Sequence, residues 1–288
     1  MANSYGPLQG KAQIVMQTAH CMIASDADYL SGLPGYAREV LHHAMQLSGY
    51  PFTIHHLAKS PRDSQYALRI GERSHPFHLV LLTGSDADRH LHHLVSAAVH
   101  IARIWSAPPA HRVAPILTHP TLPHADYREL SHANPSDSAR DLHELGTSWY
   151  ESITGLVTSA PLTLRIEEDI YRTLPEHRTI QEKALACAIE HLDAYIDPRL
   201  PLMAPRRCTG ALFALANVQV DSLSELTGLK PGPQYRRYHD PSTNRLFRSV
   251  AEANALPGFE GDVAITDAWT SLLSLREWYA WARLNVDP

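Results

Sequence analysis

A single predicted helix over residues 86–105 constrains the fold of this chain more than any other segment. Its sequence is DADRHLHHLVSAAVHIARIW. One side of the helix has the apolar spacing of a helix packed on a core, and it carries Leu91, Leu94, Val95, Ala98, Ala102 and Trp105. The other side carries small residues and histidines rather than lysine and glutamate, namely His93, Ser96, Ala97, His100 and Ile104. We therefore expect both sides of this helix to be covered by other parts of the protein.

The rest of the pattern predicts an α+β fold that is predominantly helical. Alternating and apolar runs predict a pair of strands at 66–70 and 77–82, against which we expect the side of the central helix with Leu91, Leu94, Ala98 and Trp105 to pack. Recurring prolines make residues 107–135 an expected irregular segment. Helices are predicted at 36–48, 137–157, 162–174, 181–196, 208–226 and 266–284, with shorter ones at 12–23 and 245–254. We expect a lobe with a small β-sheet over residues 1–120 and a helical lobe over 121–288, joined as one compact unit.

Composition excludes several classes of function. The chain has 288 residues, of which 44% are hydrophobic and 19% charged, so it is able to bury a large core. Its net charge of -5 gives no general attraction to nucleic acid or to an anionic membrane. No apolar run is long enough to span a bilayer, and the first residues do not form a secretory signal. We therefore expect a cytoplasmic protein that is not bound to a membrane.

Two internal segments and the C-terminal stretch match the sequence motifs of one bacterial group of proteins. HLVSAAVHIARIWSAPPAHRVAP is similar to the group's LIAHExGHILRLxxxPPEER, and ITGLVTSAPLTLRIEEDIY is similar to its ITNLPVDLRIExWLY. The ending DAWTSLLSLREWYAW also resembles the C-terminus of that group. By these motifs the chain resembles a bacterial group of zincin-like metallopeptidases, and the resemblance covers most of the chain from about residue 66. It implies a core of helix, small sheet and helix followed by a helical lobe, the plan in which zincins carry the zinc-binding HExxH motif.

The same resemblance implies that the zinc site is broken. Carried over position by position, the first metal histidine falls on Ser96, the catalytic glutamate on Ala97 and the second histidine on His100. A third ligand falls on Glu167. Serine and alanine remove a ligand and the proton acceptor together, so no catalytic residue is expected and peptidase chemistry should be absent. His100 and Glu167 would be residual metal ligands, or else a hydrogen-bonded core histidine and a carboxylate paired with Arg103 or Arg165.

Three functions stay open at this stage. The first is an inactive metallopeptidase-like protein without a cofactor, which binds or regulates a protein partner of unknown identity. The second is a metal-dependent hydrolase with zinc in a site rebuilt from His93, His100 and Glu167 or from other histidines. Sharing of one ion by His93 and His100 is disfavoured, since seven residues of helix separate them by about 10.5 Å. The third is a binder of anionic ligands or nucleic acid, because basic residues alternate with aromatic ones at Arg236, Arg237, Arg245 and Arg248.

Overall fold

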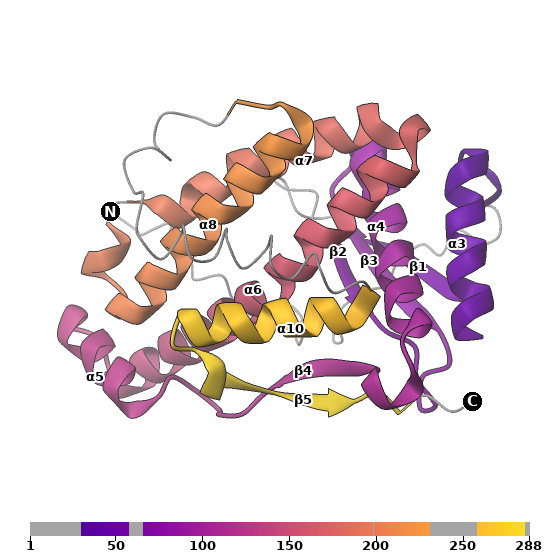
Figure 1. Ribbon diagram of the computed structural model, residues 1–288. Helices are drawn as coiled ribbons and strands as arrows, with labels where there is room; N and C mark the ends of the chain where they lie inside the picture. Colours follow the sequence, from indigo (N-terminus) through magenta and orange to yellow (C-terminus); the bar gives the residue numbers. More distant parts are fainter. Residues whose placement is uncertain (1–29, 58–65, 198, 231–257, 286–288) are drawn as a thin grey trace.

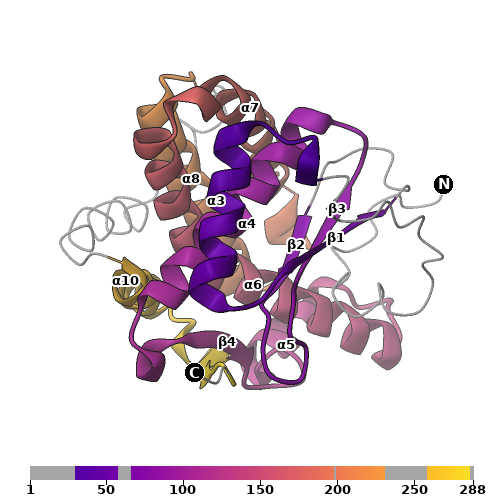
Figure 2. The same ribbon diagram turned by 90° about the vertical axis from the view of Figure 1, so that its right-hand side faces the viewer.

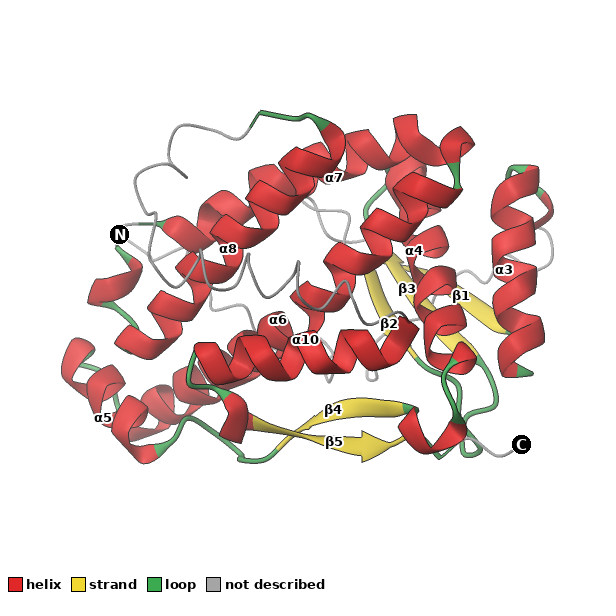
Figure 3. Cartoon of the chain, viewed as in Figure 1, coloured by secondary structure: helices red, strands yellow, loops and turns green. Residues whose placement is uncertain are grey.

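The computed structural model describes residues 30–57, 66–197, 199–230 and 258–285. These residues form an α+β fold that is predominantly helical, as predicted (Figures 1 and 3). The helices are α3 (Gly35–Ser48), α4 (Ala87–Ser106), α5 (His124–Ala133), α6 (Ala139–Thr173), α7 (Arg178–Leu192), α8 (Arg206–Thr227) and α10 (Gly258–Leu272). The strands are β1 (Phe52–Leu57), β2 (Tyr66–Arg69), β3 (His78–Thr83), β4 (Val113–Leu117) and β5 (Tyr279–Arg283). The helices predicted at 12–23 and 245–254 lie outside the described residues.

The first sheet has three strands in the order β1-β3-β2. The predicted pairing of β2 with β3 is confirmed and is antiparallel, whereas β1 was not predicted and pairs with β3 in parallel. Its sequence FTIHHL places Phe52 and Ile54 in the core, but the two adjacent histidines interrupt the alternation by which a strand is recognised. Buried residues of β1 and β3 join those of α3 and α4 in one cluster, the sheet core. Figure 2 shows α3 running beside α4, next to the strands.

Helix α4 is covered on both sides, as expected. Leu94, Ala98 and Trp105 lie in the sheet core, so their predicted packing is confirmed. Leu91 instead belongs to a smaller cluster that includes Ala37 of α3 together with Ile166 and Ile170 of α6. The prediction was wrong for Leu91 because α6, rather than the sheet, covers that part of α4. On the opposite side Ser96, Ala97 and Ile104 are buried, whereas His93 and His100 are partly buried.

Helix α6 is a single helix of 35 residues, where the sequence predicted a break at residues 158–161. Pro161 removes one backbone donor from the helix interior, which ordinarily kinks or ends a helix. Here Pro161 is buried, and Val157, Ala160 and Leu164 around it lie in a second large cluster, the helical core, with buried residues of α7, α8 and α10. Tertiary packing therefore overrides the local helix-breaking signal.

The proline-rich segment is more regular than predicted, and a strand replaces the last part of the predicted C-terminal helix. Residues 107–135 contain a short 3₁₀ turn, strand β4 and helix α5. The helix predicted at 266–284 stops at Leu272, and residues 279–283 form β5, which pairs antiparallel with β4. A short apolar run such as YAWAR has no periodicity that separates strand from helix. In this second sheet β4, which lies before residue 120, is paired with β5 near the C-terminus.

The fully buried His78 supports the sheet core through a defined tautomer. The Gly71 N–H donates to its Nδ1 at 2.9 Å, so Nε2 carries the hydrogen and donates to Ser48 Oγ, also at 2.9 Å. The imidazole ring contacts the rings of Phe52 and Trp105. Burial lowers the pKa of His78 to about 4. The side chain is therefore neutral at pH 7. Its two hydrogen bonds link the start of β3 to Gly71 in the preceding turn and to Ser48 at the end of α3.

Replacing His78 by alanine should lower the free energy of unfolding by about 3 kcal/mol at pH 7, because two buried hydrogen bonds and ring packing are lost. The stability contributed by neutral His78 is present above an unfolded pKa of 6.5 and is lost as pH falls toward 4. The variant should therefore lose less stability than the parent between pH 7 and pH 4.5. Urea unfolding across this range tests both expectations, and parallel pH profiles for the two proteins would contradict the second.

Candidate functional site

Two of the positions that the resemblance assigns to the zinc site, Ser96 and Glu167, meet in a buried interface between α4 and α6, whereas Ala97 lies in the sheet core. Ser96, Ala97 and Glu167 are all buried. The Ser96 hydroxyl donates to Glu167 Oε1 at 3.2 Å. The positions expected to carry the first and third ligands are therefore in direct contact, although 71 residues separate them.

The carboxylate of Glu167 accepts hydrogen bonds from three side chains. Besides Ser96, His92 approaches Oε1 through Nε2 at 3.2 Å, and Gln181 of α7 donates its amide to Oε2 at 2.7 Å. A carboxylate only accepts, so Nε2 of His92 carries a hydrogen. Burial alone would raise the pKa of Glu167, but the charge and hydrogen bond of His92, followed by the bonds from Gln181 and Ser96, lower it below 4.5. Glu167 is therefore ionised at neutral pH.

The hydrogen-bonded chain continues from His92 toward α3. The Nδ1 atom of His92 lies 3.2 Å from Nε2 of the fully buried His177, and the two rings are stacked. The Tyr36 hydroxyl of α3 lies 2.9 Å from His177 Nδ1. Burial, followed by the charge of His92, lowers the pKa of His177 to about 4, although Glu167 opposes this shift. We call the connected residues Tyr36, His92, Ser96, Glu167, His177 and Gln181 the Glu167 cluster.

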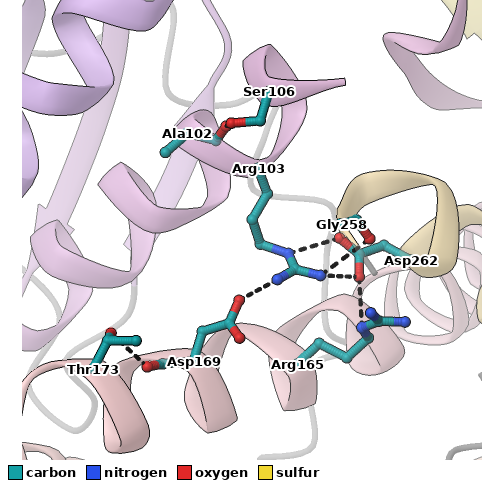
Figure 4. Close-up of polar contacts among 8 residues, drawn as sticks. All are labelled: Ala102, Arg103, Ser106, Arg165, Asp169, Thr173, Gly258 and Asp262. Atoms are coloured by element: carbon teal, nitrogen blue, oxygen red, sulfur yellow. Dashed lines mark hydrogen bonds and ion pairs between the residues drawn. The ribbon is translucent and has the colours of Figure 1, made fainter. Parts of the chain in front are cut away.

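The residue that pairs with Glu167 is not one of the two arginines expected from the sequence. Arg103 and Arg165 were its expected ion-pair partners, but both contact Asp262 of α10 instead (Figure 4). Glu167 pairs with His92, which precedes Ser96 by one helical turn. Residues 92, 96 and 100 share one side of α4 because they are spaced four apart. That spacing is the only sequence signal that would have identified His92.

Arg103 organises a second polar cluster, which joins α4 to α6 and α10. Its Nε and Nη2 atoms donate to the two carboxylate oxygens of Asp262 at 2.8 and 2.6 Å, and Nη1 donates to Asp169 of α6. Nη2 also reaches the Gly258 carbonyl oxygen at 3.2 Å (Figure 4). Burial would lower the pKa of Arg103, but Asp262 and then Asp169 raise it above its usual value. The contacts are those of a structural ion-pair network between three helices.

The other predicted site residues have separate surroundings. His100 is half-buried, and burial followed by the positive charge of Arg103 lowers its pKa to about 4. The hydrogen bonds to the Glu167 side chain come from Ser96, His92 and Gln181 rather than from His100. The ring of His93 contacts that of His92. Arg236, Arg237, Arg245 and Arg248 lie outside the described residues.

The side chains at this site do not fit a catalytic zinc ion. The first-ligand position holds a hydroxyl, and the position of the catalytic base holds a methyl group. The Glu167 oxygens already accept the three hydrogen bonds described above. Across the residues that the structure describes, no three or more histidine, cysteine, aspartate or glutamate side chains are grouped so that they could hold a metal.

Comparisons of this chain with protein-family models, curated proteins and solved structures gave no match. Among the described helices, none combines the length and apolar character needed to cross a membrane.

Glu167→Gln should lower the free energy of unfolding by about 3 kcal/mol at pH 7, because it removes one charge of a buried, hydrogen-bonded pair. Since folding lowers the pKa of Glu167 below 4.5, the stability that its ionised form contributes is present above that pH. This contribution is lost as pH falls through the folded pKa, so the difference between parent and variant should shrink in acid.

The matched control is Glu168→Gln, on the same helix. Glu168 pairs with the largely exposed Arg172 one turn away, and such surface pairs contribute less than about 1 kcal/mol. Urea unfolding of both variants at pH 7 and pH 4 makes the comparison. Equal destabilisation by the two substitutions would contradict a special role for the Glu167 cluster.

Proposed function

We propose that this chain is a catalytically inactive relative of the zincin metallopeptidases that acts as a binding or regulatory protein in the cytoplasm. The contact between Ser96 and Glu167 carries the proposal. The Ser96 hydroxyl on α4 and the Glu167 carboxylate on α6 meet although 71 residues of sequence separate them. The two oxygens here are separated by 3.2 Å. The resemblance assigned both positions to one metal, and their proximity supports that correspondence.

The chemistry of the site supports the absence of peptidase activity. Zinc peptidases need a metal to activate a water molecule and a base to accept its proton. Ala97 provides no proton acceptor, and the Ser96 hydroxyl is engaged as a donor to Glu167. Ser96, Ala97 and Glu167 are also buried, which keeps a peptide carbonyl group away from them.

A binding role follows from what the fold retains. The Glu167 cluster and the ion pairs of Arg103 with Asp169 and Asp262 hold the helices around α4 together. A folded domain whose ancestral chemistry is lost can still act through recognition of another molecule. We propose a protein partner, because the net charge of -5 gives no general attraction to nucleic acid.

The proposed ancestry is tested by rebuilding the metal site with Ser96→His and Ala97→Glu. Two histidines spaced four apart on α4, with Glu167 as the third ligand, should bind about one zinc ion per chain. Calorimetric titration with zinc measures the binding, using protein without a histidine tag. The parent should bind no stoichiometric zinc. Peptidase activity need not return, because catalysis also requires oriented groups around the metal and a substrate cleft.

The control separates metal binding from catalytic function. Ser96→His with Ala97→Gln retains the ligands but lacks the base, so it should bind zinc as the first double variant does. Adding Glu167→Gln to either variant should weaken binding by at least tenfold, since a ligand is lost. Equal and weak zinc binding by the parent and both double variants would refute the proposed ancestry.

A further inference from the structure

The Glu167 cluster compensates the negative charge of a buried carboxylate, as a bound zinc ion does at a metal site. Glu167 is 3% exposed, and an ionised carboxylate at such a site is unfavourable unless a cation or several donors compensate its charge. At a metal site the ion provides this compensation. In this chain the side chains of α4 and α7 provide it.

Two of these donors converge on one carboxylate oxygen. Ser96 Oγ and His92 Nε2 each lie 3.2 Å from Glu167 Oε1. They come from successive turns of α4, so both reach α6 from the same side of the helix. Gln181 donates to the other oxygen and also to the backbone carbonyl of Glu167, at 2.7 and 2.8 Å. Both oxygens of the carboxylate are therefore engaged.

The imidazole of His92 is held in place from its other side. Its Nδ1 lies 3.2 Å from His177 Nε2, and the ring planes are inclined by only 16°. The Tyr36 hydroxyl contacts the far nitrogen of His177. Turning His92 away from Glu167 would break the contacts that link His92 to Glu167 and to His177 in a buried interface. The arrangement joins α3, α4, α6 and the start of α7, as a structural metal would.

We propose that His92, oriented by His177 and Tyr36, replaces the metal as the partner of Glu167 and keeps that carboxylate from binding an ion. This inference rests on the proposed function, because it takes Glu167 to be a former ligand. Zinc binding by Glu167 would require the carboxylate to leave His92. His92 is then a competitor of the metal rather than a residual ligand.

The test adds His92→Ala to the Ser96→His, Ala97→Glu variant and measures zinc affinity by calorimetry. We expect at least tenfold tighter binding in the triple variant. The matched control is His90→Ala in the same background, because His90 is a buried histidine of α4 whose Nε2 contacts the Thr83 carbonyl oxygen instead. Unchanged or weaker binding on removal of His92, or an equal gain from His90→Ala, would overturn the inference.

A metal-free measurement keeps the inference separate from the proposed ancestry. In the presence of a chelator, the unfolding midpoint of the parent should not change. His92→Ala and Glu167→Gln should lower that midpoint by amounts that do not add in the double variant, whereas His90→Ala and Glu167→Gln should add. If no rebuilt variant binds zinc, the proposed ancestry fails while non-additivity still supports the pairing of His92 with Glu167. Additive effects of His92→Ala and Glu167→Gln would overturn the inference.

Discussion

The need to stabilise one buried carboxylate determines how the central helices of this protein meet. Glu167 on α6 is ionised inside the protein, and its compensation comes from His92 and Ser96 on α4 and from Gln181 on α7. A buried charge with one partner removed is far more unfavourable than an intact pair. The relative positions of α4, α6 and α7 therefore depend on these contacts as well as on apolar packing.

Helix α4 is the element through which both polar clusters act. Its first half supplies His92 and Ser96 to the Glu167 cluster, and its last turns supply Arg103 to Asp169 and Asp262. Between these polar groups, the apolar side chains of α4 fill the sheet core. The helix thus connects the sheet to α6, α7 and α10, which explains why neither of its sides has the charged character of a surface helix.

The sequence predicted the elements whose signals are periodic and local. Helices α3, α4, α7 and α8 follow from apolar spacing, and β2 with β3 from two short runs separated by a turn. The continuity of α6 through Pro161 and the pairing of β4 with β5 depend on contacts between distant segments, so local patterns failed there. Within the site, the resemblance led to Ser96 and Glu167. Gln181 was missed because a hydrogen bond to a residue distant in sequence leaves no regular spacing, and the four-residue spacing of His92 and Ser96 does not by itself reveal their shared contact with Glu167.

The unbroken course of α6 has a mechanical consequence. Thirty-five residues of α-helix extend about 50 Å, and along this length α6 contributes Ile153 and Val157 to the helical core and Ile166 and Ile170 to the cluster shared with α3 and α4. A continuous helix shared by two packed regions acts as a strut, because bending it, even at Pro161 where one backbone hydrogen bond is missing, would separate buried side chains. No connecting loop within residues 139–173 is able to serve as a hinge. The two ends of α6 are therefore expected to move together as one rigid body.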